Sequence, residues 1–152
     1  MRRSEREITD QAQIEEILRK GAVVYLGIQD ADAPYVVPLN FGYADGALFV
    51  HAALEGHKID LLCANPRVSF AVAVDDAVIP GEMGCKWSAR YRSVLGKGTA
   101  VFVDDHDAKI RAFDTLLGKF AAGPFTYAED VLARTVVIRI DIETMTGKQA
   151  GY

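Results

Sequence analysis

The sequence is poor in cysteine and has no long apolar run. Its two cysteines, Cys63 and Cys85, form no CxxC pair and are too few for a disulfide scaffold, so we expect reduced thiols in a cytoplasmic protein. No apolar stretch approaches the roughly 20 residues of a membrane-spanning helix. The opening Met-Arg-Arg-Ser is not followed by the apolar core of a secretion signal. We therefore expect no membrane partner.

Long runs of positive charge and the common nucleotide-binding motifs are also missing. The formal net charge is −4, and no basic run provides the electrostatic footprint of a nucleic-acid-binding protein. P-loop, GxGxxG and GxSxG motifs are absent. The three histidines are scattered and have no zinc-like spacing, so we expect no metal site. The remaining composition is ordinary for one globular domain, which we place at residues 1–152.

Six segments carry the β-branched and aromatic residues that are typical of β-strands. They are residues 22–28, 35–43, 47–53, 68–76, 92–105 and 137–142. Asp45-Gly46 is a strong hairpin signal, and Gly96 and Gly98 indicate a bulge or a close backbone approach. Short turns imply antiparallel pairing, and a sheet of this length closes most easily into a barrel. We therefore predict a mainly β (α+β) fold, a six-stranded antiparallel β-barrel with peripheral helices.

Three helices are expected around this barrel. The first spans about residues 9–20, where apolar residues repeat at helical spacing behind a Thr9 or Asp10 cap. A short second helix follows Gly56 and ends before Pro66, and a third spans about residues 107–120. A loop rich in glycine and proline is expected up to about residue 86.

The second helix begins with an unusual pair of residues. Its first turn carries His57 and Lys58, although the free N–H groups and the dipole at a helix start favour negative charge. A bound anion, above all a phosphate, removes this conflict, and Gly56 allows the backbone to approach it closely. The alternative is that both residues are solvated surface side chains. The local pattern leaves the two interpretations open.

Several longer stretches resemble one known family. PLNFGY, FVHAALEGHKIDLLCANPRVSF and YRSVLGKG, together with the opening RRSEREITD and the closing MTGKQ, resemble the pyridoxamine 5′-phosphate oxidase-like flavin-binding superfamily. Within it the match is to the nitroimidazole-resistance (NimA-type) branch. The resemblance covers nearly the whole chain. It implies a split β-barrel homodimer that binds FMN in two equivalent clefts at the subunit interface.

The resemblance also assigns residues to the cofactor. It implies that Lys58 binds the FMN phosphate, with Gly56 and His57 beside it, and that His51 and Ala52 lie beneath the ribityl chain and phosphate. Ser93 matches a polar position that reaches FMN, usually that of the partner subunit. The strand along the isoalloxazine ring corresponds to Val37, Pro38, Leu39 and Asn40.

Two ring-bearing residues keep alternative interpretations. His51 is the candidate catalytic residue, but a lone strand histidine is more often structural, and we do not expect it to bind metal. Trp87, the only tryptophan, is expected in core or interface packing, with an aromatic wall over a flavin as the alternative. His106 is expected to be a solvated cap at a helix start and not a ligand.

The implied function is that of an FMN-dependent oxidoreductase. Its expected substrate is a small electron-poor molecule, nitroaromatic or quinone-like, with NAD(P)H as a candidate donor. The chain ends in MTGKQAGY and lacks the C-terminal Arg and Trp motif of the vitamin-forming oxidases, which argues against vitamin B6 oxidation. The alternatives are a non-catalytic flavin-binding module for storage or sensing, and a haem-handling split-barrel protein.

Overall fold

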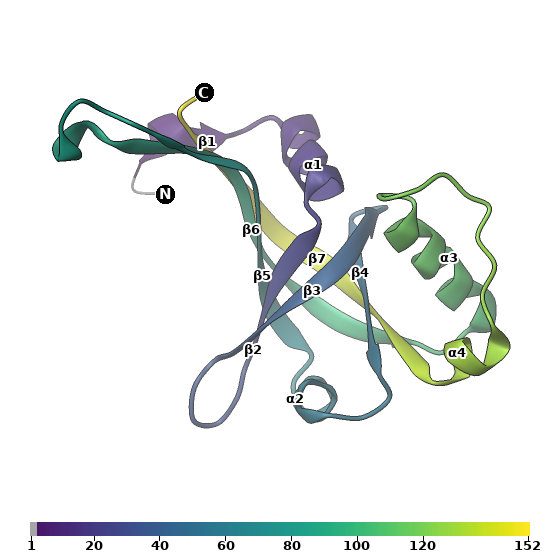
Figure 1. The fold of residues 1–152 in the computed structure, drawn as a ribbon. Helices are drawn as coiled ribbons and strands as arrows, with labels where there is room; N and C mark the ends of the chain where they lie inside the picture. The colour runs from purple at the N-terminus through teal and green to yellow at the C-terminus, as the bar shows by residue number, and fades with distance from the viewer. Residues whose placement is uncertain (1–2) are drawn as a thin grey trace.

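The computed structural model describes residues 3–152, so the first two residues of the expected domain, including Arg2 of the opening motif, lie outside the described residues. The described chain is mainly β (Figure 1). Its strands are β1 (Glu7–Ile8), β2 (Val23–Ile28), β3 (Tyr35–Ala44), β4 (Ala47–Ala53), β5 (Arg67–Ile79), β6 (Ser88–Val103) and β7 (Thr135–Ala150).

Six of these strands form a closed antiparallel barrel. The order β7-β4-β3-β2-β5-β6 is closed by pairing of β6 with β7, and β1 adds beside the far end of β7. This confirms the predicted six-stranded barrel. The two-residue strand β1 was not predicted, because so short a segment carries no periodic signal.

Within the described residues, four helices lie around the barrel. They are α1 (Gln11–Lys20), α2 (His57–Ala64), α3 (His106–Leu117) and α4 (Glu129–Ala133), with short 3₁₀ turns η1 (Ser4–Arg6) and η2 (Gly84–Lys86). The predicted cap of α1 is confirmed, because the Asp10 side chain accepts a hydrogen bond from the backbone N–H of Ala12. The five-residue helix α4 was not predicted. No helix within residues 3–152 is long and apolar enough to cross a membrane.

A main apolar core and a smaller set of buried residues hold these elements together. The main core fills the barrel, and α1 contributes Ile14, Ile17 and Leu18 to it. A smaller set of buried residues lies outside that cluster on α3, α4 and β7: Ala112, Leu116, Leu132 and Val137. Figure 1 shows α3 and α4 packed against the outside of the barrel at the right. The helices that follow β6 therefore cover one outer face of the sheet.

The barrel opens between β3 and β4. These strands pair only from Phe41 opposite Val50 to Ala44 opposite Ala47, around the predicted Asp45-Gly46 turn, where both residues have positive φ. Residues 35–40 of β3 continue with β2 alone, and residues 51–53 of β4 continue with β7 alone. The chain then leaves β4 and starts α2 at His57. This opening positions the candidate site.

Two irregularities interrupt the ladders of β5 and β6, and at the first both strands continue beyond the ends predicted for them. The register of β5 against β6 shifts between Val74 and Ala77, where Asp75 has a φ of 58°, and pairing then resumes as far as Ile79. The strand end predicted at residue 76 is instead a bulge. A second shift lies between Lys97 and Gly98. This confirms the bulge that the two glycines of β6 predicted.

Gly98 marks the closest backbone approach in the barrel wall. A methyl group there would lie 2.3 Å from the Asp141 carbonyl oxygen, which belongs to the backbone and cannot move aside. We predict that Gly98→Ala lowers the free energy of unfolding by about 1–3 kcal/mol, as overpacking does. Gly84→Ala is the control, since a methyl group at Gly84 would meet no atom within 4 Å. Urea denaturation compares the two, and equal stability would contradict the close approach.

Candidate functional site

The opening of the barrel brings most of the expected site residues together. Residues 37–40 lie on the part of β3 that has left β4, and His51 and Ala52 lie on the part of β4 that has left β3. Gly56, His57 and Lys58 follow at the start of α2. Three separate stretches of sequence therefore meet at one opening.

The free edge of β3 offers backbone groups more than side chains. Val37 and Leu39 are half-buried and pack against the barrel core, whereas Pro38 and Asn40 are exposed. The Asn40 side chain is already engaged, since its Nδ2 donates to the Ala22 carbonyl oxygen at 3.1 Å. The backbone between residues 35 and 40 pairs with β2 on one side only. An open strand edge of this kind presents unpaired N–H and C=O groups to a ligand.

The start of α2 has no side-chain cap. Asp10 and Asp105 cap α1 and α3, but the residue before α2 is Gly56, with a φ of 130°. The Gly56 carbonyl oxygen accepts from the N–H groups of Ile59 and Asp60, at 2.8 and 3.2 Å. Within residues 3–152, the N–H groups before them, on His57 and Lys58, have no acceptor. A Cβ at Gly56 would meet nothing within 4 Å, so this helix start faces open space. The two free N–H groups are suited to bind an anion.

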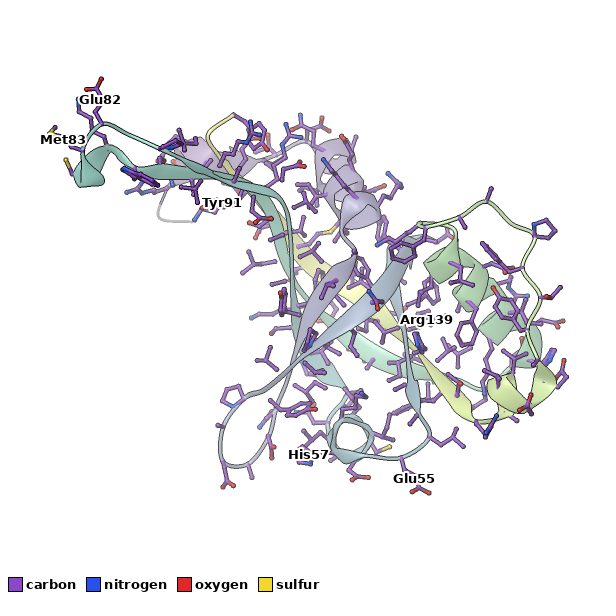
Figure 2. All side chains as sticks on the ribbon, viewed as in Figure 1. Glu55, His57, Glu82, Met83, Tyr91 and Arg139 are labelled. Atoms are coloured by element: carbon purple, nitrogen blue, oxygen red, sulfur yellow. The ribbon has the colours of Figure 1, made fainter. Side chains whose placement is uncertain are left out.

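His57 has a partner that the sequence did not indicate. Its Nε2 lies 2.6 Å from Asp30 Oδ2, and the ring of Tyr35 meets its ring edge-on with 5.2 Å between centroids. The hydrogen bond from His57, followed by that from the Ala31 N–H, lowers the pKa of Asp30. His57 lies at the lower end of the molecule in Figure 2. The His57 side chain is thus met by a carboxylate from the β2–β3 loop.

Lys58 is the cation that remains at this helix start. It is half-buried and makes no ion pair with any residue from 3 to 152. The spare donors of α2 and the Lys58 ammonium group therefore lie on the same first turn. Their combined charge favours a phosphate.

His51 and Ala52 differ sharply in exposure. Ala52 is buried in the core, so only its backbone can serve a ligand. His51 is exposed, and its ring contacts Phe113 of α3 with 5.8 Å between centroids. Phe113 in turn contacts Tyr127, whose hydroxyl donates to Asp114 at 2.7 Å. Sequence reasoning missed Phe113 and Tyr127, because their contact with β4 depends on how the segment after β6 folds back.

Ser93 lies apart from the other expected site residues. It is half-buried on β6, where it pairs with Ala73 on one side and Lys148 on the other. Asn40 lies on β3, and the strands β5 and β2 separate it from Ser93 on β6. Three inter-strand spacings amount to about 14 Å. Within one chain, Ser93 does not join the cluster at the barrel opening.

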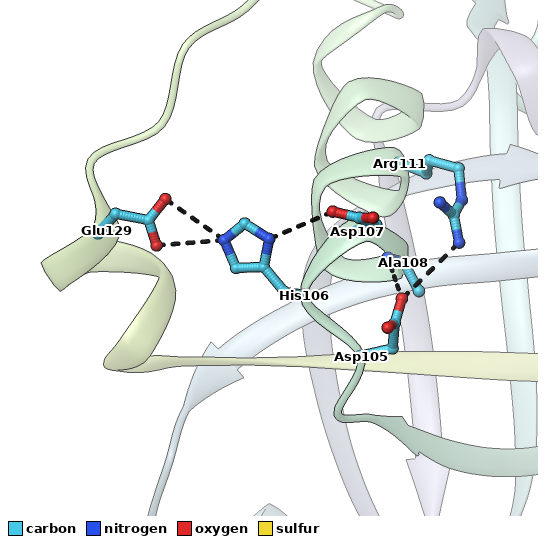
Figure 3. A network of polar contacts seen from close by, with 6 residues as sticks. All are labelled: Asp105, His106, Asp107, Ala108, Arg111 and Glu129. Carbon is cyan, nitrogen blue, oxygen red and sulfur yellow. Dashed lines mark hydrogen bonds and ion pairs between the residues drawn. The ribbon is translucent and has the colours of Figure 1, made fainter.

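The third histidine links α3 to α4 (Figure 3). His106 Nε2 lies 3.1 Å from Glu129 Oε2, and its Nδ1 lies 3.4 Å from Asp107 Oδ1. Asp105, and not His106, caps α3 by accepting from the Ala108 N–H. No group of three His, Cys, Asp or Glu side chains within the described part of the chain is arranged to hold a metal ion.

A closed six-stranded barrel with its free edge between β3 and β4 defines a split-barrel protein. The family model for pyridoxamine 5′-phosphate oxidase matches residues 10–149, and the chain belongs to this family. No curated protein matches the sequence.

Solved structures share this fold over nearly the whole chain. A structure from Bacteroides thetaiotaomicron assigned to 5-nitroimidazole antibiotic resistance is 30% identical, covers 94% of this chain and 86% of its own, and has a TM-score of 0.84. A FAD-binding protein from Mesorhizobium loti is 26% identical, covers 96% and 98%, and has a TM-score of 0.69. A FAD- and haem-binding protein from Mycobacterium smegmatis, 21% identical over 97% and 74%, with a TM-score of 0.85, shows the fold alone.

The link between α3 and α4 is expected to depend on pH. The contact with Asp107, and then that with Glu129, raises the pKa of His106 above its ordinary value. A raised folded-state pKa adds stability below the unfolded pKa, and this stability is lost as the pH rises through the folded pKa. Glu129→Gln and Asp107→Asn should each lower the pKa of His106 in an NMR titration. An unchanged value in both variants would contradict these contacts.

Proposed function

We propose that the protein binds FMN at the opening of the barrel, with the phosphate on the start of α2. The observation that supports this most strongly is the uncapped first turn of α2, where two free N–H groups accompany Lys58 and face open space. A phosphate bound by these donors would also explain why the chain carries positive charge at a helix start.

The proposal also assigns roles to the neighbouring groups. The open edge of β3 at residues 37–40 would orient the isoalloxazine ring through backbone N–H and C=O groups. His51, exposed beside this edge and held against Phe113, would hold or donate a proton at an atom of the substrate. Flavin supplies the redox chemistry, and the protein supplies binding and orientation.

The proposed activity is the reduction of a small electron-poor molecule, nitroaromatic or quinone-like, with NAD(P)H as the donor. The 30% identical relative assigned to nitroimidazole resistance and the 26% identical FAD-binding relative support a flavin and this class of substrate. The competing proposal is a module that binds flavin without turnover. A flavin spectrum of the purified protein, bleached in anaerobic titration with NADH or NADPH, supports the enzyme. A flavin spectrum that neither donor bleaches supports the binding module, and a haem spectrum contradicts both.

We also propose that the protein is a homodimer with its two flavin sites at the interface. Pro38, Tyr25, Ala71 and Leu95 are neighbours across four adjacent strands and face outward, and we call these four residues the apolar row. Tyr25 and Leu95 are each 51% exposed, and Val36 beside Pro38 is 59% exposed. A continuous apolar surface of this kind marks an interaction site. Pro38 belongs to the edge that we assign to flavin, so an interface here includes the site.

Lys58→Ala tests the phosphate site. We predict that it weakens FMN binding by about 1.5–3 kcal/mol, the range for a hydrogen bond to a charged group. Riboflavin, which lacks the phosphate, should bind weakly and respond little to the substitution. Arg19→Ala, which removes one exposed positive charge on α1, is the control. Fluorescence titration gives the affinity of each protein for both ligands, and equal losses for FMN and riboflavin in Lys58→Ala would count against a phosphate role.

The molecular mass of the protein in solution tests the dimer proposal. Light scattering at micromolar concentration should give about twice the 16.6 kDa of one chain. Leu95→Glu should shift the protein towards monomer, because it puts a charge within the apolar row. A folded wild-type monomer saturated with FMN would overturn the proposal.

A further inference from the structure

Beyond the barrel, β5 and β6 continue as a two-stranded hairpin, residues 77–90, which we call the arm. Its ladder has three pairs, from Ala77 opposite Arg90 to Ile79 opposite Ser88. The arm projects from the barrel at the upper left of Figure 1, and Figure 2 places Glu82 and Met83 at its outer end. Every residue from 82 to 90 is exposed. An isolated two-stranded hairpin is marginally stable in water at best, so the arm needs a surface to pack on.

The base of the arm is fixed to the barrel. The Asp75 carboxylate at the bulge forms ion pairs with Lys20 of α1 and Arg92 of β6. The Tyr152 hydroxyl donates to the Asp75 carbonyl oxygen at 3.2 Å, and its ring lies 4.3 Å from the Arg92 guanidinium carbon. The barrel therefore sets the direction of the arm, while the far end stays unpacked.

The unpacked part of the arm is apolar. Val78 is 66% exposed, Met83 55% and Trp87 56%. Side chains of this size gain free energy when they leave water, and an aromatic side chain contributes most. The arm thus carries surface that is suited to an interface.

The same chain carries a matching surface that its own arm leaves uncovered. The apolar row and Val36 stay exposed although the arm grows from β5 and β6, two of the four strands that carry the row. We propose that the arm of one copy packs on the apolar row of a second copy, and that Trp87 then lies beside the flavin-binding edge of β3 there. When the arm of each copy covers the apolar row of the other, the two contacts are equivalent and the interface has two-fold symmetry. This inference rests on the proposed flavin site.

The position of Ser93 agrees with this arrangement. Ser93 follows the arm by three residues on β6 and is about 14 Å from Asn40 of its own chain, as three strand spacings require. An arm that crosses to a second copy carries its own β6 towards that copy's flavin site. Ser93 and Asn40, which lie far apart within one chain, thus come close to each other between two chains.

Trp87 provides a direct readout, because it is the only tryptophan. Acrylamide should quench its fluorescence several-fold less in the flavin-free wild-type protein than in Leu95→Glu. Trp87→Ala should weaken FMN binding by about threefold to tenfold, the range of an aromatic contact. Phe120→Ala is the control, since Phe120 is 58% exposed and lies beyond the end of α3. It should leave FMN affinity unchanged.

Mixed dimers test whether Trp87 serves the flavin site of its own chain or that of the other copy. Lys58→Ala and Trp87→Ala chains are co-expressed with different tags, and the heterodimer is isolated and titrated with FMN. If Trp87 serves the other copy, one site of the heterodimer carries both substitutions and the other carries neither. Half of the sites then bind FMN with wild-type affinity.

Three results would overturn the inference. They are a heterodimer with no wild-type site, a Trp87→Ala homodimer that binds FMN normally, and full acrylamide access to Trp87 in the wild type. Flavin binding would stand in each case. If Lys58→Ala leaves FMN affinity unchanged, the phosphate site fails instead, and acrylamide access still tests the arm.

Discussion

The parting of β3 from β4 is the constraint on which the rest of the structure depends. Closure of the barrel through β6 and β7 satisfies the backbone groups around its wall, but β3 and β4 separate beyond Phe41 and Val50. One strand edge is then left open, and the chain must leave β4 and enter α2 beside it. Backbone donors and acceptors on the strand and free N–H groups on the helix meet there. A buried core could not leave such groups unpaired, so the opening needs either water or a ligand.

Local chemistry predicted the elements whose cause is local. Asp45 and Gly46 both adopt positive φ in a two-residue turn, as an Asp-Gly pair favours, and Asp10 caps α1. The barrel was predicted from strands that are joined by short turns. The opening in the barrel and the family were predicted from the resemblance of longer motifs. Strand ends were less predictable, because Asp75 forms a bulge where the sequence suggested a stop. Much of the arm was predicted as a loop because of its glycine and proline residues.

The candidate site was predictable in its position more than in its contacts. Gly56, His57 and Lys58 were singled out by a charge conflict within one helical turn. Asp30, which accepts the His57 hydrogen bond, lies 27 residues away in a loop, and nothing in its own surroundings marks it. The contact of His51 with Phe113 likewise exists only because α3 folds back over β4. Tertiary placement, and not residue type, decides which side chains share the opening.

The central claim is that the start of α2 holds the phosphate of a flavin. NMR titration of the ¹⁵N-labelled, flavin-free protein tests it most directly, because the amides of His57 and Lys58 have no acceptor within the described chain. FMN should move these two amide signals strongly downfield and also shift those of the open β3 edge, whereas riboflavin should shift only the β3 signals. Binding of FMN that leaves the His57 and Lys58 amides unmoved would contradict the account.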